Sequence, residues 1–253
     1  MTDAPRFEAS EMSVSGSTAV LTLTGDKVHS LGKGVLDEIV AFVAFCERDP
    51  DVSALVLTGN GDIFSAGLNV NEVLAESADS VLDAFQSALL RILQCPLPTV
   101  AAVNGAAIAG GCLLACVCDR RLIADEARIG VTELKVGVAF PVFTVDLLRH
   151  VCGARAEDVI FGAGLFEATE ACAIGLAHQH FPRTELRATA IVEAEQLAKL
   201  DAAAYALAKA TARRDLVASE QDDRGRALDR EVRAYWQSDA TRANLERLVA
   251  PKR

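Results

Sequence analysis

Two glycine-rich segments contain the residues whose types and spacing could do chemistry. They cover residues 64–68 and 104–111, and each follows a short apolar run and precedes a candidate helix. Glycine has no side chain to keep a ligand away from the backbone N–H groups. Two such loops, each leading into a helix N-terminus, could direct two N–H donors at one developing negative oxygen. This arrangement would stabilise an enolate or a tetrahedral oxyanion.

An acidic residue, Glu133, lies in a largely apolar segment shortly after the second glycine loop. One interpretation is a carboxylate at the start of a helix after Thr132, where negative charge is favourable. The other is a general base whose pKa is raised by apolar neighbours such as Leu113, Val138 and Phe140. The residues by themselves leave both interpretations open.

Strand and helix patterns alternate over the first three quarters of the chain. The strand patterns cover residues 17–24, 53–58, 99–103 and 120–124, and the helical patterns cover 34–47, 80–93 and 111–118. This alternation is typical of parallel βαβ units, so the fold class is α/β.

The pattern changes near Leu186. Long helices are expected from there on, over residues 187–210, 220–237 and 239–249, and no strand pattern is present. We therefore predict a core domain over residues 1–185 and a helical region over 186–253. A helical region without a core of its own is expected to pack on the parent domain or on a neighbouring subunit.

Composition excludes several classes of partner. The net charge of −10 argues against binding to nucleic acid or to an anionic membrane surface. Residues 92–118 carry no charge and could span a bilayer by length, but Pro96, Pro98 and Asn104 favour a buried strand, loop and helix. The N-terminus lacks the apolar core of a signal peptide. We expect a cytoplasmic protein with no membrane partner.

The seven cysteines show no disulfide framework. Cys112 and Cys116 lie one helical turn apart in an apolar run, and no nearby histidine completes a tetrahedral metal site. We predict buried thiols and no metal. The four histidines are scattered, and the phosphate-binding, dinucleotide and serine-nucleophile motifs are absent.

Taken together, these segments resemble the crotonase (enoyl-CoA hydratase/isomerase) superfamily over about residues 20–182. The residues that carry the resemblance are 64–68, 102–105, 109–112, Cys118, Asp119, Glu133 and Gly137. The resemblance implies a ββα-spiral core with a helical trimerisation region, in a homotrimer or a dimer of trimers. It implies acyl-CoA thioester substrates, with coenzyme A as part of the substrate and no separate cofactor.

The resemblance also assigns roles to residues of the site. Leu68 and Gly110 would supply the two oxyanion N–H groups, and Glu133 would be the base. The expected coenzyme A contacts are Lys27, His29, Ser65, Ala66 and Leu68, with Lys33 a further basic candidate. Lys27 and Lys33 could equally be ordinary surface lysines. Asn69 and His29 replace an aspartate and an asparagine that are common in the family.

One departure discriminates between reactions of the superfamily. Its hydratases carry a second glutamate at the position of Leu113, because one group must activate water while another handles the proton at C2. A single base is enough to move a proton between C2 and C4. The sequence therefore resembles the Δ3,Δ2-enoyl-CoA isomerases most. Hydration, thioester hydrolysis, decarboxylation and non-catalytic acyl-CoA binding stay open as alternatives.

Overall fold

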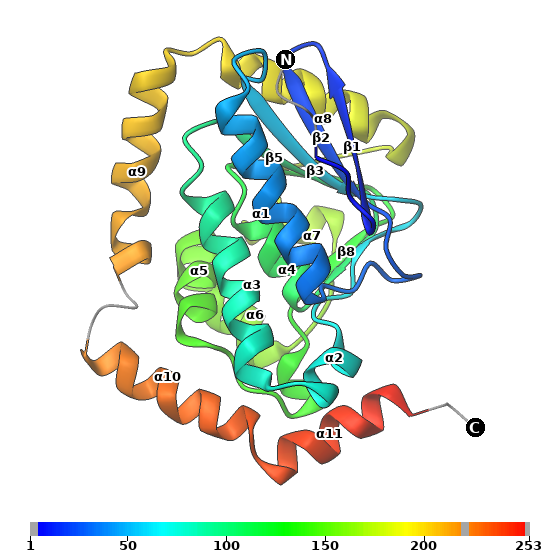
Figure 1. The fold of residues 1–253 in the computed structure, drawn as a ribbon, viewed down its shortest axis with the longest axis vertical. Helices are drawn as coiled ribbons and strands as arrows, with labels where there is room; N and C mark the ends of the chain where they lie inside the picture. Colours follow the sequence, from blue (N-terminus) through cyan, green and yellow to red (C-terminus); the bar gives the residue numbers. More distant parts are fainter. Residues whose placement is uncertain (1–4, 219–222, 251–253) are drawn as a thin grey trace.

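The structure, a computed structural model, describes residues 5–218 and 223–250. Its larger sheet has the strand order β1 (Ser10–Ser15), β2 (Thr18–Leu23), β3 (Ala54–Gly59), β5 (Thr99–Val103), β7 (Arg120–Ala124) and β10 (Gln179–Phe181). Only β1 is antiparallel to its neighbour. Every residue of β2, β3 and β5 is buried, as expected for a parallel sheet covered on both faces. The four strands predicted from the sequence are confirmed as β2, β3, β5 and β7, of which Figure 1 labels the first three.

A smaller sheet contains much shorter strands, in the order β4 (Ile63–Ser65), β6 (Ala106–Ile108), β8 (Arg128–Gly130) and β9 (Phe166–Glu167). The chain runs from β3 to β4, from β5 to β6 and from β7 to β8, and a helix follows each pair. This repeat of two strands and a helix is the ββα spiral that the resemblance implied. Three-residue strands are too short to produce an alternating pattern, so the sequence analysis missed them.

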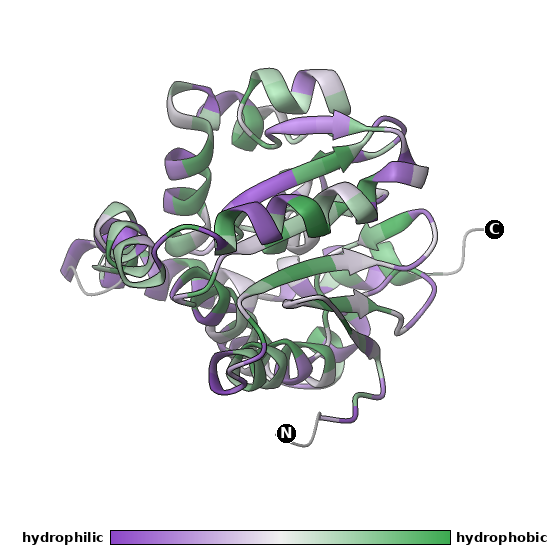
Figure 2. Cartoon of the chain, turned by 90° about the horizontal axis from the view of Figure 1, so that it is seen from above, coloured by the Kyte–Doolittle hydropathy of each residue, from purple (hydrophilic) through white to green (hydrophobic). Residues whose placement is uncertain are grey.

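Helices cover the sheets. The sequence predicted α1 (Lys33–Arg48), α3 (Ala78–Leu93) and α4 (Gly110–Cys116). The helices that it did not predict in this part of the chain are α2 (Val70–Ala75), η1 (Glu133–Val136), α5 (Val142–Cys152), η2 (Gly153–Arg155), α6 (Ala156–Gly162) and α7 (Ala168–Ala173). Figure 2 shows apolar central strands, more polar strands at one side, and helices with mixed apolar and polar faces. No helix within residues 5–218 and 223–250 is long and apolar enough to cross a bilayer.

The C-terminal region differs from the prediction in one place. The single helix expected over 187–210 is two helices, α8 (Arg183–Ala198) and α9 (Ala202–Ala218). Asp201 Oδ1 accepts a hydrogen bond from Ala204 N at 2.8 Å, so Asp201 starts a new helix. The many alanines on both sides favour helix throughout and hide this break in the sequence.

The remaining predicted helices are α10 (Asp223–Trp236) and α11 (Asp239–Val249). Residues 220–222 of the helix predicted over 220–237 lie outside the described residues. The domain boundary predicted between residues 185 and 186 falls in the first turn of α8. This helix packs against β3, β5 and β7. At the other end of the helical region, α10 packs against α3 and α5, while α11 packs against α2 and η1.

A buried carboxylate joins α9 to the large sheet. The side chain of Asp119 is 10% exposed and is surrounded by hydrogen-bond donors. These donors are Thr99 N at 2.8 Å, Tyr205 Oη at 2.9 Å, Lys209 Nζ at 2.8 Å and the Arg213 guanidinium at 2.8 Å. Because every donor points at one carboxylate, the network fixes α9 against the end of the sheet.

Candidate active site

Three parallel strands of the small sheet end at the same edge, and the candidate residues follow them directly. After β4 comes Leu68, after β6 comes Gly110, and after β8 comes Glu133. The carboxyl ends of neighbouring parallel strands meet at one edge, which is where ligands bind in many α/β folds. All three residues line one cavity of about 700 Å³. The structure therefore brings together the three catalytic candidates from the sequence.

The two glycine loops touch each other. Gly67 has φ +94°, and a Cβ on it would lie 2.9 Å from Gly110 N. A Cβ on Gly110 would lie 3.4 Å from Leu68 N. Gly111 packs so closely on Ser65 that a Cβ there would overlap the Ser65 carbonyl oxygen. Glycine at these positions is what allows the two backbones to approach.

The N–H groups of Leu68 and Gly110 are available to a ligand. Gly110 is the first residue of α4 and follows Ala109, whose φ of 52° and ψ of −121° are rare for a residue with a side chain. Around Leu68, the backbone hydrogen bonds join Leu31 to Gly67 and Asn69 instead. Within the described residues neither amide donates a hydrogen bond. The cavity wall thus offers two neighbouring donors to one oxygen.

Glu133 is the first residue of η1, and its side chain reaches the same cavity. Its Oε2 is buried and has no hydrogen-bond partner among the described residues. Burial raises the pKa of Glu133 to about 7, although the backbone N–H groups of Thr132 and Glu133 oppose part of the shift. Leu113, Val138 and Phe140 line the cavity with it, as the sequence predicted. A carboxyl group with a near-neutral pKa can both accept and donate a proton.

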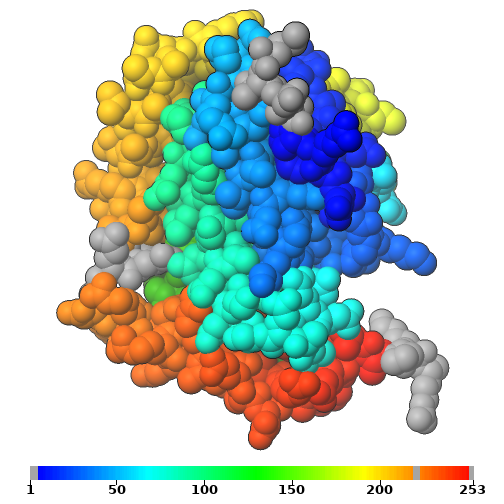
Figure 3. Space-filling view, in the orientation of Figure 1, coloured from blue at the N-terminus to red at the C-terminus, as the bar shows by residue number. Residues whose placement is uncertain are grey.

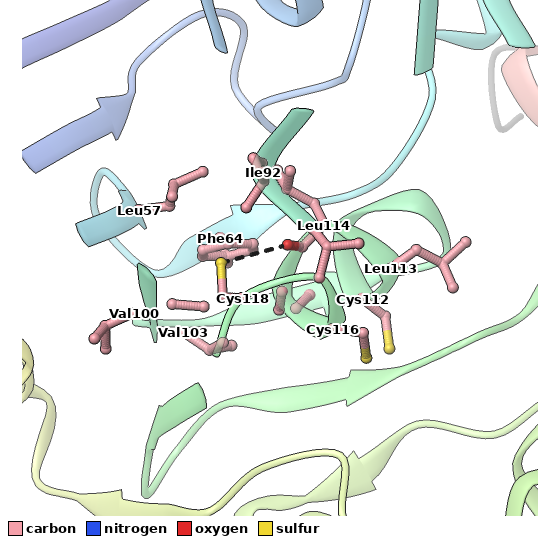
Figure 4. Close-up of a cluster of buried hydrophobic side chains, with 14 of the residues drawn as sticks. Leu57, Phe64, Ile92, Val100, Val103, Cys112, Leu113, Leu114, Cys116 and Cys118 are labelled. Carbon is pink, nitrogen blue, oxygen red and sulfur yellow. Dashed lines mark hydrogen bonds between the residues drawn. The ribbon is translucent and has the colours of Figure 1, made fainter. Parts of the chain in front are cut away.

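Leu113 occupies the cavity side of α4. Figure 4 shows its side chain on the side of this helix away from Leu57 and Val100, which belong to the core. It is 2% exposed and lines the cavity. A hydrocarbon side chain therefore shares the cavity wall with the candidate base, and it can neither hold nor activate a water molecule.

Asp26 is the other acidic residue in the described lining of the cavity. Its carboxylate accepts hydrogen bonds from Val28 N at 3.0 Å, Ser30 N at 3.0 Å and Ser30 Oγ. Partial burial raises the pKa of Asp26, but the hydrogen bonds from Ser30 and Val28 outweigh it, and the net shift is downward. Asp26 therefore remains ionised near neutral pH and shapes the loop that bears it.

The C-terminal helices form a wall of the cavity that the sequence analysis did not anticipate. The residues from this region are Trp236, Leu245, Leu248 and Val249, which line the cavity together with Leu82 and Phe85 of α3. In Figure 3, α10 and α11 lie along the lower edge of the molecule against the segment that contains α2. The sequence feature that could have drawn attention to this wall is Trp236, the single tryptophan of the chain.

A family model described as enoyl-CoA hydratase/isomerase matches residues 13–248. The chain belongs to this family. The human mitochondrial enoyl-CoA delta isomerase 1 is 33% identical over 211 residues, which are 81% of this chain and 70% of that protein. A Thermus thermophilus protein named as an enoyl-CoA hydratase is 40% identical over 159 residues, and the match spans 60% of this chain and 63% of the relative.

Solved structures agree with the sequence comparisons. The crystal structure of human mitochondrial delta3-delta2-enoyl-CoA isomerase matches with a TM-score of 0.89 and 28% identity, covering 96% of this chain and 97% of that one. Members of the enoyl-CoA hydratase/isomerase family act on acyl-CoA thioesters, and the cavity has the apolar lining that an acyl chain requires.

The family's coenzyme A segment is only partly represented in the cavity wall. Ala66 and Leu68 line the cavity, whereas Ser65 lies beneath it and donates through Oγ to the His29 carbonyl at 2.8 Å. His29 itself is buried, with φ 50° and its Nε2 3.0 Å from the Asn60 carbonyl oxygen. Lys27 is exposed and outside the lining.

Lys33 is also held away from the cavity, because its ammonium group pairs with Glu76 at 3.1 Å. The cysteines are free thiols, and all but the partly buried Cys172 are buried. In the described parts of the chain, no group of three or more His, Cys, Asp or Glu side chains could hold a metal ion.

Proposed function

We propose that this protein shifts the double bond of a 3-enoyl-CoA to the 2-position with a single carboxylate. The observation that carries the proposal is Glu133 Oε2, a buried oxygen on the wall of an apolar cavity that has no hydrogen-bond partner within residues 5–218 and 223–250. The same cavity is lined by Leu68 and Gly110, whose N–H groups donate no hydrogen bond to any part of the chain that the structure describes. A base and two oxyanion donors are the parts that enolate chemistry on a thioester needs.

The proposed reaction moves one proton and consumes no water. The Glu133 carboxylate removes a proton from C2, and the electron pair spreads over the thioester oxygen and C4. Leu68 N–H and Gly110 N–H stabilise the negative oxygen, each by about 3–4 kcal/mol. Neutral Glu133 then returns the proton to C4, which leaves the double bond between C2 and C3. A pKa near 7 suits both steps, because the group must be a base first and an acid afterwards.

Hydration is the second candidate, because the Thermus thermophilus relative is named as a hydratase. Adding water needs a group that activates it, and two of the polar side chains that line the cavity already form hydrogen bonds within the protein. Thr144 Oγ1 donates to the Pro141 carbonyl at 2.7 Å, and Asn69 Oδ1 caps α2 through Glu72 N. Together with Leu113, these contacts favour isomerisation over hydration.

Three further predictions belong to the same proposal. Coenzyme A is expected along Ala66 and Leu68, with Lys27, His29 and Ser65 near its path. The homotrimer or dimer of trimers follows from family likeness, and sedimentation would test it. A cytoplasmic location is proposed because the cysteines are unpaired, which is typical of a reducing compartment.

The test is product analysis with two substrates. The purified protein is incubated with a 3-enoyl-CoA and, separately, with the corresponding 2-enoyl-CoA. We expect conversion of the first to the 2-enoyl product and little 3-hydroxyacyl-CoA from the second. Efficient formation of 3-hydroxyacyl-CoA, or no turnover of either substrate, would overturn the proposal.

A further inference from the structure

The turn that follows Glu133 is held by side chains from the far end of the chain. Trp236 Nε1 donates to the Ala139 carbonyl at 2.8 Å, and Asn244 Nδ2 donates to the Gly137 carbonyl at 3.1 Å. These donors come from two different helices, about a hundred residues later in the sequence.

Gly137 is directly connected to the base. It ends η1 in the left-handed conformation, with φ 68°, and its N–H donates to the Leu134 carbonyl at 3.2 Å. The next N–H, of Val138, donates to the Glu133 carbonyl at 3.0 Å. A four-residue 3₁₀-helix has little stability of its own. Whatever fixes the Gly137 carbonyl therefore also fixes the orientation of Glu133.

Asn244 is suited to this task because its amide has a defined orientation. Its Oδ1 accepts from the Arg247 guanidinium, which leaves Nδ2 to face Gly137. The contact is close, since a Cβ on Gly137 would overlap Asn244 Nδ2. An aspartate at 244 could still pair with Arg247, but it would place an oxygen against the Gly137 carbonyl oxygen.

The two helices that carry these side chains are themselves anchored. Arg233 of α10 forms ion pairs with two aspartates of α3, Asp83 at 2.8 Å and Asp79 at 3.6 Å. Trp236 and Leu245 belong to a buried apolar cluster with Val138 and residues of α3. The donors to Gly137 and Ala139 are thus fixed to the body of the protein.

We propose that Asn244 and Trp236 are positioning residues, which align Glu133 for proton transfer through the Gly137–Ala139 backbone. The inference rests on the proposed function, because it takes Glu133 as the base. Glu133 is then aligned by α10 and α11 of its own chain. Neither residue handles the proton itself, so their loss affects the geometry of the transfer more than substrate binding.

The test compares Asn244→Asp with Gln237→Glu in the full-length protein. Both change an amide to an acid near the α10–α11 junction, but Gln237 donates to Asp79 of α3 and not to the turn. We expect Asn244→Asp to lower kcat roughly 10–100-fold with KM within about threefold, because small misplacements of a catalytic group are costly. Gln237→Glu should stay within about twofold of wild type. Trp236→Phe, which removes only the N–H donor, should lower kcat about 3–10-fold.

Hydrogen exchange of residues 133–140 provides a readout that does not depend on activity. We expect faster exchange of the Val138 amide in Asn244→Asp and no change in Gln237→Glu. Faster exchange in a protein that does not isomerise 3-enoyl-CoA would support the positioning role of Asn244 and overturn the proposed function alone. Unchanged exchange, unchanged kcat, or an equal loss in Gln237→Glu would each overturn the inference.

Discussion

Two largely buried carboxylates have opposite surroundings: Asp119, which holds α9 against the large sheet, and Glu133, on the wall of the cavity. Asp119 accepts from a backbone N–H, a tyrosine hydroxyl, a lysine and an arginine. Glu133 has a buried oxygen with no partner in the described parts of the chain. Buried polar groups are normally satisfied, because an unpaired one costs free energy. The fully bonded carboxylate holds the fold together, and the unsatisfied one remains available for chemistry.

The largest effect is expected at Glu133. Glu133→Gln keeps the shape of the side chain but removes the base, so kcat should fall about 10²–10⁴-fold with little change in KM. Steady-state kinetics with a 3-enoyl-CoA measures this. Glu76→Gln, which alters an exposed ion pair with Lys33, is the control and should stay within about twofold. Undiminished turnover by Glu133→Gln would refute the role of this residue.

Asp119→Ala is expected to act on stability instead. It leaves Lys209 and Arg213 buried without their carboxylate, which should lower the free energy of unfolding by about 3–5 kcal/mol. Urea denaturation measures the change, and kcat per folded molecule should stay within about threefold. Glu167→Ala, in an exposed pair with Arg128, should cost less than about 1 kcal/mol. If Asp119→Ala lost activity without losing stability, the contrast between the two carboxylates would fail.

Gly67→Ala tests the oxyanion donors. The new methyl group would lie 2.9 Å from Gly110 N and cover that donor, so kcat should fall roughly 10²–10³-fold. Gly61→Ala is the matched control, because Gly61 has φ +67° but nothing within 4 Å of a Cβ. It introduces similar backbone strain without touching the cavity. Equal losses of kcat in both variants would show that strain, and not access to the N–H group, causes the effect.

The dependence of stability on pH gives a smaller effect. The pKa of Glu133 is raised from 4.5 to about 7, so the folded state binds more protons between these values. The contribution of Glu133 to the free energy of unfolding is therefore fully present below pH 4.5 and is lost as the pH rises through 7. Glu133→Gln lacks this loss and should exceed wild type by roughly 2–3 kcal/mol at pH 8 but by little at pH 4.5. Urea titrations at both pH values measure the difference, and an equal difference at both would contradict the raised pKa.

The sequence predicted much of the site because its glycine loops and Glu133 are visible as local patterns. The roles of Leu68 and Gly110, and the importance of Leu113, came from the resemblance to the crotonase superfamily. The buried strands β3, β5 and β7 were recognisable from composition. The small sheet was not, because its strands are too short to show a periodicity.

Other features depend on contacts between distant residues. Asn244 meets Gly137 only because α10 folds back on α3 and α11 on α2 and η1, and no local pattern encodes that direction. The placement of His29 follows from its positive φ and from the Asn60 carbonyl, which lies on another loop. The break before Asp201 depends on a single capping residue within an alanine-rich stretch.

The central claim is that one carboxylate carries the proton from C2 to C4. A single-turnover reaction of a C2-deuterated 3-enoyl-CoA in ordinary water, analysed by NMR, tests it directly. We predict a 2-enoyl-CoA product with part of the deuterium at C4, and loss of this transfer in Glu133→Gln. A product with no deuterium at C4, or formation of 3-hydroxyacyl-CoA in its place, would contradict the account.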